Sequence, residues 1–178
     1  MKTTFNDLIL ELDFNIIDTE YSINNHPKNI VSYDFLSKNN NSYSVYFLMT
    51  TEENELLSDG TMLGNYTNLT EIPTIFFSLS NRKFDDIFNK LANNKEYLEV
   101  MGKVIFIILE FIKKHKYTVY SIGEVGDKKI NFYNNYRKFF NDFKILTGKS
   151  SNYINNGGKM NAYYLIKTKS DLKIKDTL

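Results

Sequence analysis

Residues 96–102, EYLEVMG, raise the first question of chemistry, because they open a strongly apolar stretch that continues to Lys114. A helix N-terminus presents free backbone N–H groups and partial positive charge, and a glycine there lets a phosphate approach closely. Here only Gly102 supplies that feature. Glu96 and Glu99 fall in the first turns, where two carboxylates repel a diphosphate but stabilise an empty helix start by about 0.3–1 kcal/mol each. The pattern therefore favours a helix that caps itself over a phosphate site.

The two histidines are not accompanied in the sequence by the other residues that a metal or catalytic site needs. His26 lies in a predicted loop before Pro27, and no H-E-x-x-H spacing occurs anywhere in the chain. His115 ends the apolar helix candidate, where an imidazolium interacts favourably with the helix dipole. We therefore expect no metal site, and we interpret His115 as a cation at a helix C-terminus.

Three further motifs have simpler explanations than catalysis. Ser121 is not surrounded by the G-x-S-x-G elbow of a serine nucleophile. The segment 123–129, GEVGDKK, lacks Walker spacing, and Asp127 can cap a helix that follows it. Asp85 and Asp86 are neighbours on a helix candidate and point about 100° apart, which suits a solvated face.

Composition limits the classes of protein. The chain has 178 residues, enough for one domain that buries roughly two-thirds of its unfolded surface. The longest apolar run, 104–109, is too short to span a bilayer, and acidic residues within the first 14 positions argue against a signal peptide. The lack of Cys excludes disulfides, Cys-based zinc sites and a Cys nucleophile. We expect a protein of the cytoplasm, or of a particle assembled there, with no membrane partner.

Charge argues against a direct, specific nucleic-acid partner. The net charge is +1, and basic and acidic residues are interleaved. Arg82 and Arg137 are the only arginines, and Lys lacks the bidentate fork that reads guanine or clamps phosphate.

Tyrosine and phenylalanine are unusually frequent, at 13 and 14 residues. Tyrosine suits protein–protein interfaces, because it buries a large face while its hydroxyl stays hydrated. Tyr66, Tyr136 and Tyr153, each next to Asn, are candidates for such a surface. Codon bias explains the same residues equally well, because heavy use of Asn, Lys, Ile, Tyr and Phe indicates a genome rich in A and T, in a bacterium or its virus.

Hydrophobic patterning predicts the elements that must position these residues. The run 71–80 is continuously apolar, as in a central strand covered on both faces, and Asn39–Asn41 form the turn of a hairpin. We predict further loops at 154–159 and at Asp59–Gly60. The helix candidates are 3–12, 81–94, 96–114 and 128–143, and the strand candidates are 29–37, 42–50, 71–80, 117–123 and 161–169.

This order predicts an α+β (mixed α/β) fold, with a central mixed sheet flanked by helices. We find no linker and no internal repeat. We therefore expect one domain over residues 1–169 and a flexible C-terminal tail over 170–178.

Two segments, MGKVIFIILEFI (101–112) and KINFYNNYRKFF (129–140), together with the element order, resemble the GCN5-related N-acetyltransferase fold. The likeness is to the acetyltransferase-like proteins encoded by tailed bacteriophages. It covers roughly the C-terminal 100 residues, and the N-terminal third supports it only by its helix and hairpin.

The resemblance implies where a cofactor and a catalytic acid would lie. Active relatives hold acetyl-CoA with R/Q-x-x-G-x-G/A, which places Tyr97 and Val100 at the Arg/Gln and first Gly positions and Gly102 at the last. Only Gly102 agrees, although a register that uses 91–96 as the loop stays open. Tyr133 corresponds to the tyrosine that protonates the leaving thiolate in active relatives. It lacks the Gly-Phe that usually follows, and its alternative role is packing on the sheet.

The resemblance, with the degenerate cofactor loop and the many tyrosines, implies a non-catalytic, acetyltransferase-like phage protein that acts through protein–protein contacts and binds no cofactor. It would be a virion component such as a head–tail connector or ring protein, found in the virion or the host cytoplasm, with other virion proteins or itself as partners. One alternative is an active acetyl-CoA-dependent N-acetyltransferase. The other is an accessory inhibitor of a host protein.

Overall fold

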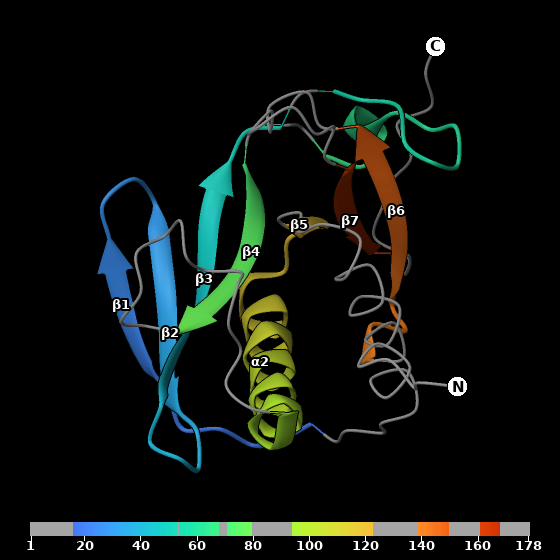
Figure 1. The fold of residues 1–178 in the computed structure, drawn as a ribbon. Coiled ribbons are helices and arrows are strands. Elements are labelled where there is room, and N and C mark those ends of the chain that lie inside the picture. Colours follow the sequence, from blue (N-terminus) through green and yellow to red (C-terminus); the bar gives the residue numbers. More distant parts are fainter. Residues whose placement is uncertain are drawn as a thin grey trace, which may run out of the picture. The chain divides into compact units, whose positions relative to one another are not determined.

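The computed structural model describes residues 16–52, 54–67, 71–79, 94–122, 139–149 and 161–167. These residues form a mixed α+β fold with a sheet in the order β1-β2-β3-β4-β5-β7-β6 (Figure 1). The strands are β1 Ser22–His26, β2 Ile30–Leu36, β3 Ser42–Thr50, β4 Ile72–Leu79, β5 Val119–Ile122, β6 Phe143–Lys149 and β7 Asn161–Lys167. The helices are the 3-10 turn η1, Leu63–Asn65, and the long α2, Asn94–His115.

The pairing pattern follows from the connections. β1 and β2 are antiparallel, with Ser22 opposite Asp34, as a short turn requires. β4 and β5 are parallel, with Thr74 opposite Ser121, and the chain between them includes α2, as a parallel crossover needs. β7 is antiparallel to both β5 and β6. The predicted mixed sheet is therefore confirmed.

The chain divides into two compact units. Unit 1 comprises Met1–Phe47 and Phe76–Lys116, and unit 2 comprises Leu48–Ile75 and Tyr117–Leu178. The division passes through β3 and β4, so that each unit has its own portion of these strands.

The core of unit 1 is built on α2 and an aromatic cluster. The ring of Phe111 on α2 stacks on Phe47 of β3 with centroids 3.6 Å apart, and Tyr33 of β2 meets both rings edge-on. α2 is apolar almost all round, which predicts an interior helix. The structure confirms this: the fully or nearly fully buried residues of α2 include Val100, Met101, Val104, Ile105, Ile107, Ile108 and Phe111.

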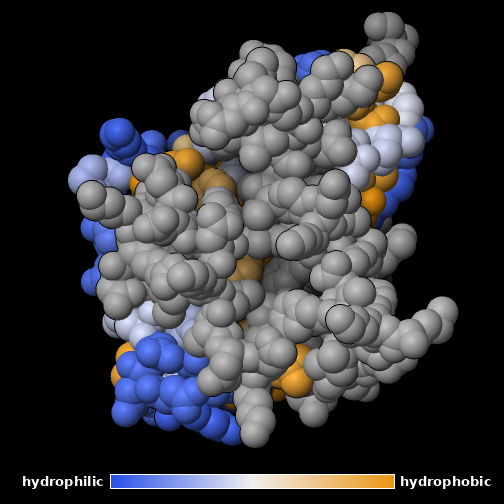
Figure 2. All heavy atoms as spheres, in the orientation of Figure 1, coloured by the Kyte–Doolittle hydropathy of each residue, from blue (hydrophilic) through white to orange (hydrophobic). Residues whose placement is uncertain are grey.

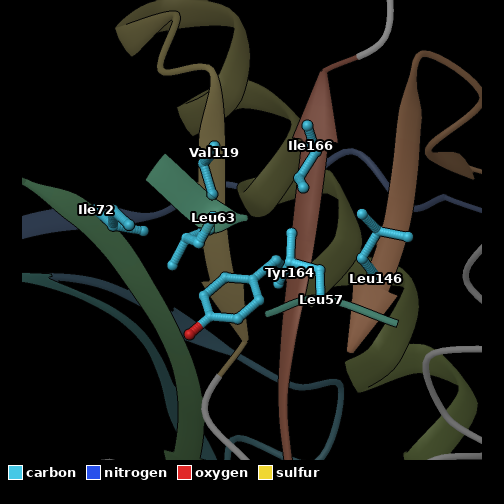
Figure 3. Packing of buried hydrophobic residues seen from close by; sticks show 7 residues of the cluster. All are labelled: Leu57, Leu63, Ile72, Val119, Leu146, Tyr164 and Ile166. Carbon is cyan, nitrogen blue, oxygen red and sulfur yellow. The ribbon is translucent and has the colours of Figure 1, made fainter. Parts of the chain in front are cut away.

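The core of unit 2 brings together side chains from four strands and the loop that precedes β4. Figure 3 shows this cluster, in which Tyr164 of β7 lies among aliphatic side chains. Its members are Leu57, Leu63, Ile72, Val119, Leu146, Tyr164 and Ile166, and Tyr66 packs against them. Tyr66 is therefore half-buried rather than the surface residue that the sequence predicted. Tyr33, Tyr43, Tyr120 and Tyr164 are likewise core residues.

Most of the predicted elements that can be compared are confirmed. The hairpin forms at β2 and β3, and Asn40 in its turn adopts the left-handed conformation, with φ of 59°. Gly60 does the same in the Asp59–Gly60 turn, with φ of 84°. β4 is buried at four successive residues from Ile72 to Ile75, as a central strand should be.

The sequence missed β1 and β6. β1 has the polar sequence SINNH, and all five residues are exposed, so it carries no alternating apolar signal. β6 begins at Phe143, the last residue of the helix predicted at 128–143. That helix up to residue 138, the candidates at 3–12 and 81–93, the loop at 154–159 and the tail 170–178 lie outside the described residues.

Candidate functional site: the start of helix α2

The loop between β2 and β3 meets the first turns of α2 in unit 1. The loop is closed by two backbone hydrogen bonds, Ser37 N to Asn41 O and Asn40 N to Ser37 O, each 2.9 Å. Ser37 Oγ also accepts from the amides of Asn39 and Asn41, at 3.3 and 3.2 Å. Short polar side chains that bond to nearby backbone favour such turns. The loop is therefore held rigid before it contacts the helix.

Glu96 is the main contact between this loop and the helix. Its side chain is almost completely buried, with 3% of the residue exposed. The Ser37 hydroxyl donates to Oε1, and the Asn41 amide Nδ2 donates to Oε1 and Oε2 at 2.9 and 3.0 Å. A buried carboxylate needs several donors to be stable, and this loop supplies them.

Glu99 makes the second contact, one turn further along α2. Its Oε1 accepts from the backbone amide of Lys38 at 2.8 Å and forms an ion pair with Lys103 Nζ at 2.9 Å. Lys103 Nζ also donates to the carbonyl of Leu36 at 2.7 Å. The lysine therefore links the end of β2 to a carboxylate on its own helix.

The electrostatics keep Glu96 ionised at neutral pH. Burial alone would raise the pKa of its carboxyl, but hydrogen bonds from Ser37, Asn41 and other neighbours outweigh burial and hold the pKa below its usual range. Tyr43 lies beside it on β3. Burial raises the pKa of Tyr43 to about 12, and the negative charge of Glu96 acts in the same direction.

The residues that correspond to a cofactor loop lie on α2 in a poor position to bind a phosphate. Val100 is fully buried. Gly102 is also buried, and its carbonyl accepts a hydrogen bond from the backbone amide of Ile17 at 3.3 Å. Tyr97 lies in the first two turns of the helix, but its side chain is outside the described residues. The alternative loop at 91–96 is described only from Asn94, and Tyr133 is not described.

Taken together, these contacts place two carboxylates where a helix start would hold an anion. The partial positive charge of the helix N-terminus stabilises Glu96 and Glu99. Both Glu96 oxygens, and Glu99 Oε1, already accept hydrogen bonds from the hairpin loop or Lys103. A diphosphate entering here would meet negative charge and would have to displace the loop.

A second pair of titratable groups lies in unit 2. The hydroxyl of Tyr164, which is fully buried, donates to Glu55 Oε1. Gly148 of β6 lies so close that a Cβ at that position would be 2.5 Å from the carboxyl carbon of Glu55. The pair therefore fastens the segment before η1 to β7 and β6.

Both histidines contact neighbouring side chains of the fold. The His26 ring nitrogen Nε2 lies 2.7 Å from Ser32 Oγ. His115 is the last residue of α2, as predicted, and its ring stacks on Phe111 with centroids 4.3 Å apart. Partial burial and the nearby Lys114 lower its pKa, although the residue as a whole is exposed. The described residues contain no group of His, Asp and Glu arranged to hold a metal, and Ser121 is buried in β5.

The sequence indicates the two glutamates at the helix start but not the residues that bind them. Ser37 and Glu96 are 59 positions apart, and Asn41 and Glu96 are 55 apart. A polar turn following a strand signals a loop, but nothing in its composition indicates which helix it will contact. The excess of donors in SKNNN, residues 37–41, is the only signal that a buried acceptor was needed.

Comparison with protein-family models, curated proteins and solved structures finds no significant match to this chain. In the part of the chain that the structure describes, no helix is long and apolar enough to cross a membrane. Conclusions about function therefore depend on the geometry of the chain itself.

Proposed function

We propose that this chain is a non-catalytic protein with an acetyltransferase-like fold, of the kind encoded by tailed bacteriophages. It acts by binding other proteins, as a virion component such as a head–tail connector or ring protein. The observation that carries the proposal is the start of α2, where Glu96 is buried and bound by Ser37 and Asn41.

The element order supports the acetyltransferase-like part of the proposal. β4 and β5 are a parallel pair, α2 comes between them in the chain, and β7 pairs antiparallel with β5 on its other side. A long helix between two parallel strands belongs to the element order on which the resemblance partly rests, together with segments 101–112 and 129–140. We expect no catalysis, because carboxylates occupy the first turns of that helix, where a diphosphate needs free backbone N–H groups.

The calorimetric test uses the full chain and acetyl-CoA. We expect no binding heat at ligand concentrations up to the millimolar range. Uptake with micromolar affinity would overturn the proposal and make the active N-acetyltransferase the leading function. Two variants test whether the carboxylates prevent binding: Glu96→Gln with Glu99→Gln removes both at the helix start, and Glu110→Gln removes a partly exposed one on the same helix.

A second experiment separates a virion component from an inhibitor of a host protein. Mass spectrometry of purified particles of the encoding phage should detect the chain at a defined copy number. Its absence from particles, together with specific recovery of one host protein by the purified chain, would favour the accessory inhibitor.

A further inference from the structure

Among the described residues, no strand pairs with the outer edge of β1 in unit 1. β2 is the one neighbour of β1 in the strand order, and all five β1 residues are exposed. Blue, hydrophilic residues show in patches along the left margin of Figure 2, the side on which Figure 1 labels β1. An edge strand presents unpaired N–H and C=O groups to which an extended segment of another chain can add.

β6, the strand at the other end of the sheet order, is partly covered. In unit 2, Leu57 forms a β-bridge with Gly148 of β6, and Ser58 N donates to the carbonyl of Thr147 at 2.8 Å. A loop of the same chain therefore covers part of that edge. β1 has no such cover from the described residues, and its sequence SINNH has none of the Lys or Pro residues that discourage edge pairing.

A cavity of about 540 Å³ lies where the chain enters β1. Its lining includes three carboxylates and one ammonium group, and that ammonium is already bound to Glu99 and to the carbonyl of Leu36. The cavity therefore has an excess of negative charge. The lining includes Asp18, Glu20, Tyr21, Asp34, Phe35 and Lys103.

Asp34 gives this cavity an unfilled acceptor. It lies opposite Ser22 in the β1–β2 ladder, and its Oδ2 accepts from Asn24 Nδ2 at 2.5 Å. Its Oδ1 is buried and has no hydrogen-bond partner among the described residues. An unsatisfied buried acceptor costs free energy that a donor from outside would recover, and a Lys or Arg side chain is the donor that suits a carboxylate.

We propose that β1 and this cavity form a docking site for an extended, basic segment of a partner protein. The segment adds to the outer edge of β1, and one of its Lys or Arg side chains enters the cavity and donates to Asp34. This inference rests on the proposed function and specifies the chemistry of its partner. A second copy of the chain fits less well. Pairing of two β1 strands over five residues would bury far less area than the roughly 1,200 Å² that a stable interface buries.

The test uses the full chain and two synthetic nonapeptides of alternating Lys and Val, or Glu and Val. We expect the Lys peptide to bind with micromolar affinity, more weakly as salt rises, and to slow hydrogen exchange at amides of residues 22–26. Asp34→Asn should weaken binding by about tenfold or more. Glu71→Gln, which removes an exposed carboxylate in unit 2, should leave it within about twofold.

Four results would overturn the docking site: equal binding of the Glu peptide, no change in exchange at 22–26, equal weakening by the control variant, or free lysine amide binding as tightly as the peptide. If Asp34→Asn fails to fold, Glu20→Gln at an exposed lining position takes its place. A dimer in the native mass spectrum of the free chain, together with slowed hydrogen exchange at residues 22–26 in that dimer, would also reject it. None of these results bears on the acetyl-CoA test, so the two proposals fail separately.

Discussion

At the scale of single residues, Glu96 is the side chain on which the hairpin loop and α2 depend. Replacing it with Gln keeps its size but turns one acceptor into a donor that faces the Asn41 amide. We expect Glu96→Gln to lower the free energy of unfolding by about 1–3 kcal/mol, because hydrogen bonds to a buried charge are lost. Urea denaturation measures this. Glu110→Gln, at a surface pair with Lys113, should change stability by less than about 0.5 kcal/mol. Equal effects of the two variants would contradict the role given to Glu96.

His115 makes stability depend on pH. Its pKa in the folded protein lies below the usual histidine value of 6.5, because partial burial beside Phe111 and the charge of Lys114 disfavour the imidazolium. The unfolded chain therefore binds more protons in this range, and stability rises with pH. We expect the stabilising contribution to be complete above about pH 6.5 and to be lost as the pH falls through the folded pKa. Denaturation midpoints between pH 5 and 7.5 measure it, and His115→Phe, which keeps the stacking but not the titration, should flatten the profile.

At the scale of elements, the contact of β6 with the segment before η1 is tight enough to test. A Cβ at Gly148 would lie 2.5–2.8 Å from the Glu55 carboxylate, so Gly148→Ala forces this side chain away from Tyr164 and should cost roughly 0.5–1.5 kcal/mol, the contribution of that hydrogen bond. In a Glu55→Ala background the same substitution should cost much less, because the crowding group is gone. Thermal unfolding of the two single variants and the double variant measures the coupling. Strictly additive effects would show that the carboxylate is not what excludes a side chain at Gly148.

The strands and helices also differ in how well the sequence predicts them. The sequence predicts the hairpin, β4, β5, β7 and the interior helix α2, because continuous or periodic apolar runs and an Asn turn mark them. β1 was not readable, because an edge strand with both faces exposed needs no apolar pattern; its partner β2 supplies the order. At the site, Glu96 and Glu99 could be found from their position at a helix start. Ser37 and Asn41 could not, because tertiary packing alone decides which acceptor a polar turn meets.

At the scale of the whole molecule, acetyl-CoA should leave the stability of the chain unchanged. A ligand that binds the folded state stabilises it by about 2.7 kcal/mol when its concentration is 100 times its dissociation constant. For a chain of this size that is a rise of roughly 5–11 °C in melting temperature. An enzyme with a dissociation constant of about 10 µM would therefore respond clearly to about 1 mM acetyl-CoA. Because the carboxylates at the start of α2 are already paired with the β2–β3 loop, we expect a shift below about 1 °C. A shift of several degrees, matched by coenzyme A and not by acetate, would mean that the diphosphate binds and that the non-catalytic assignment is wrong.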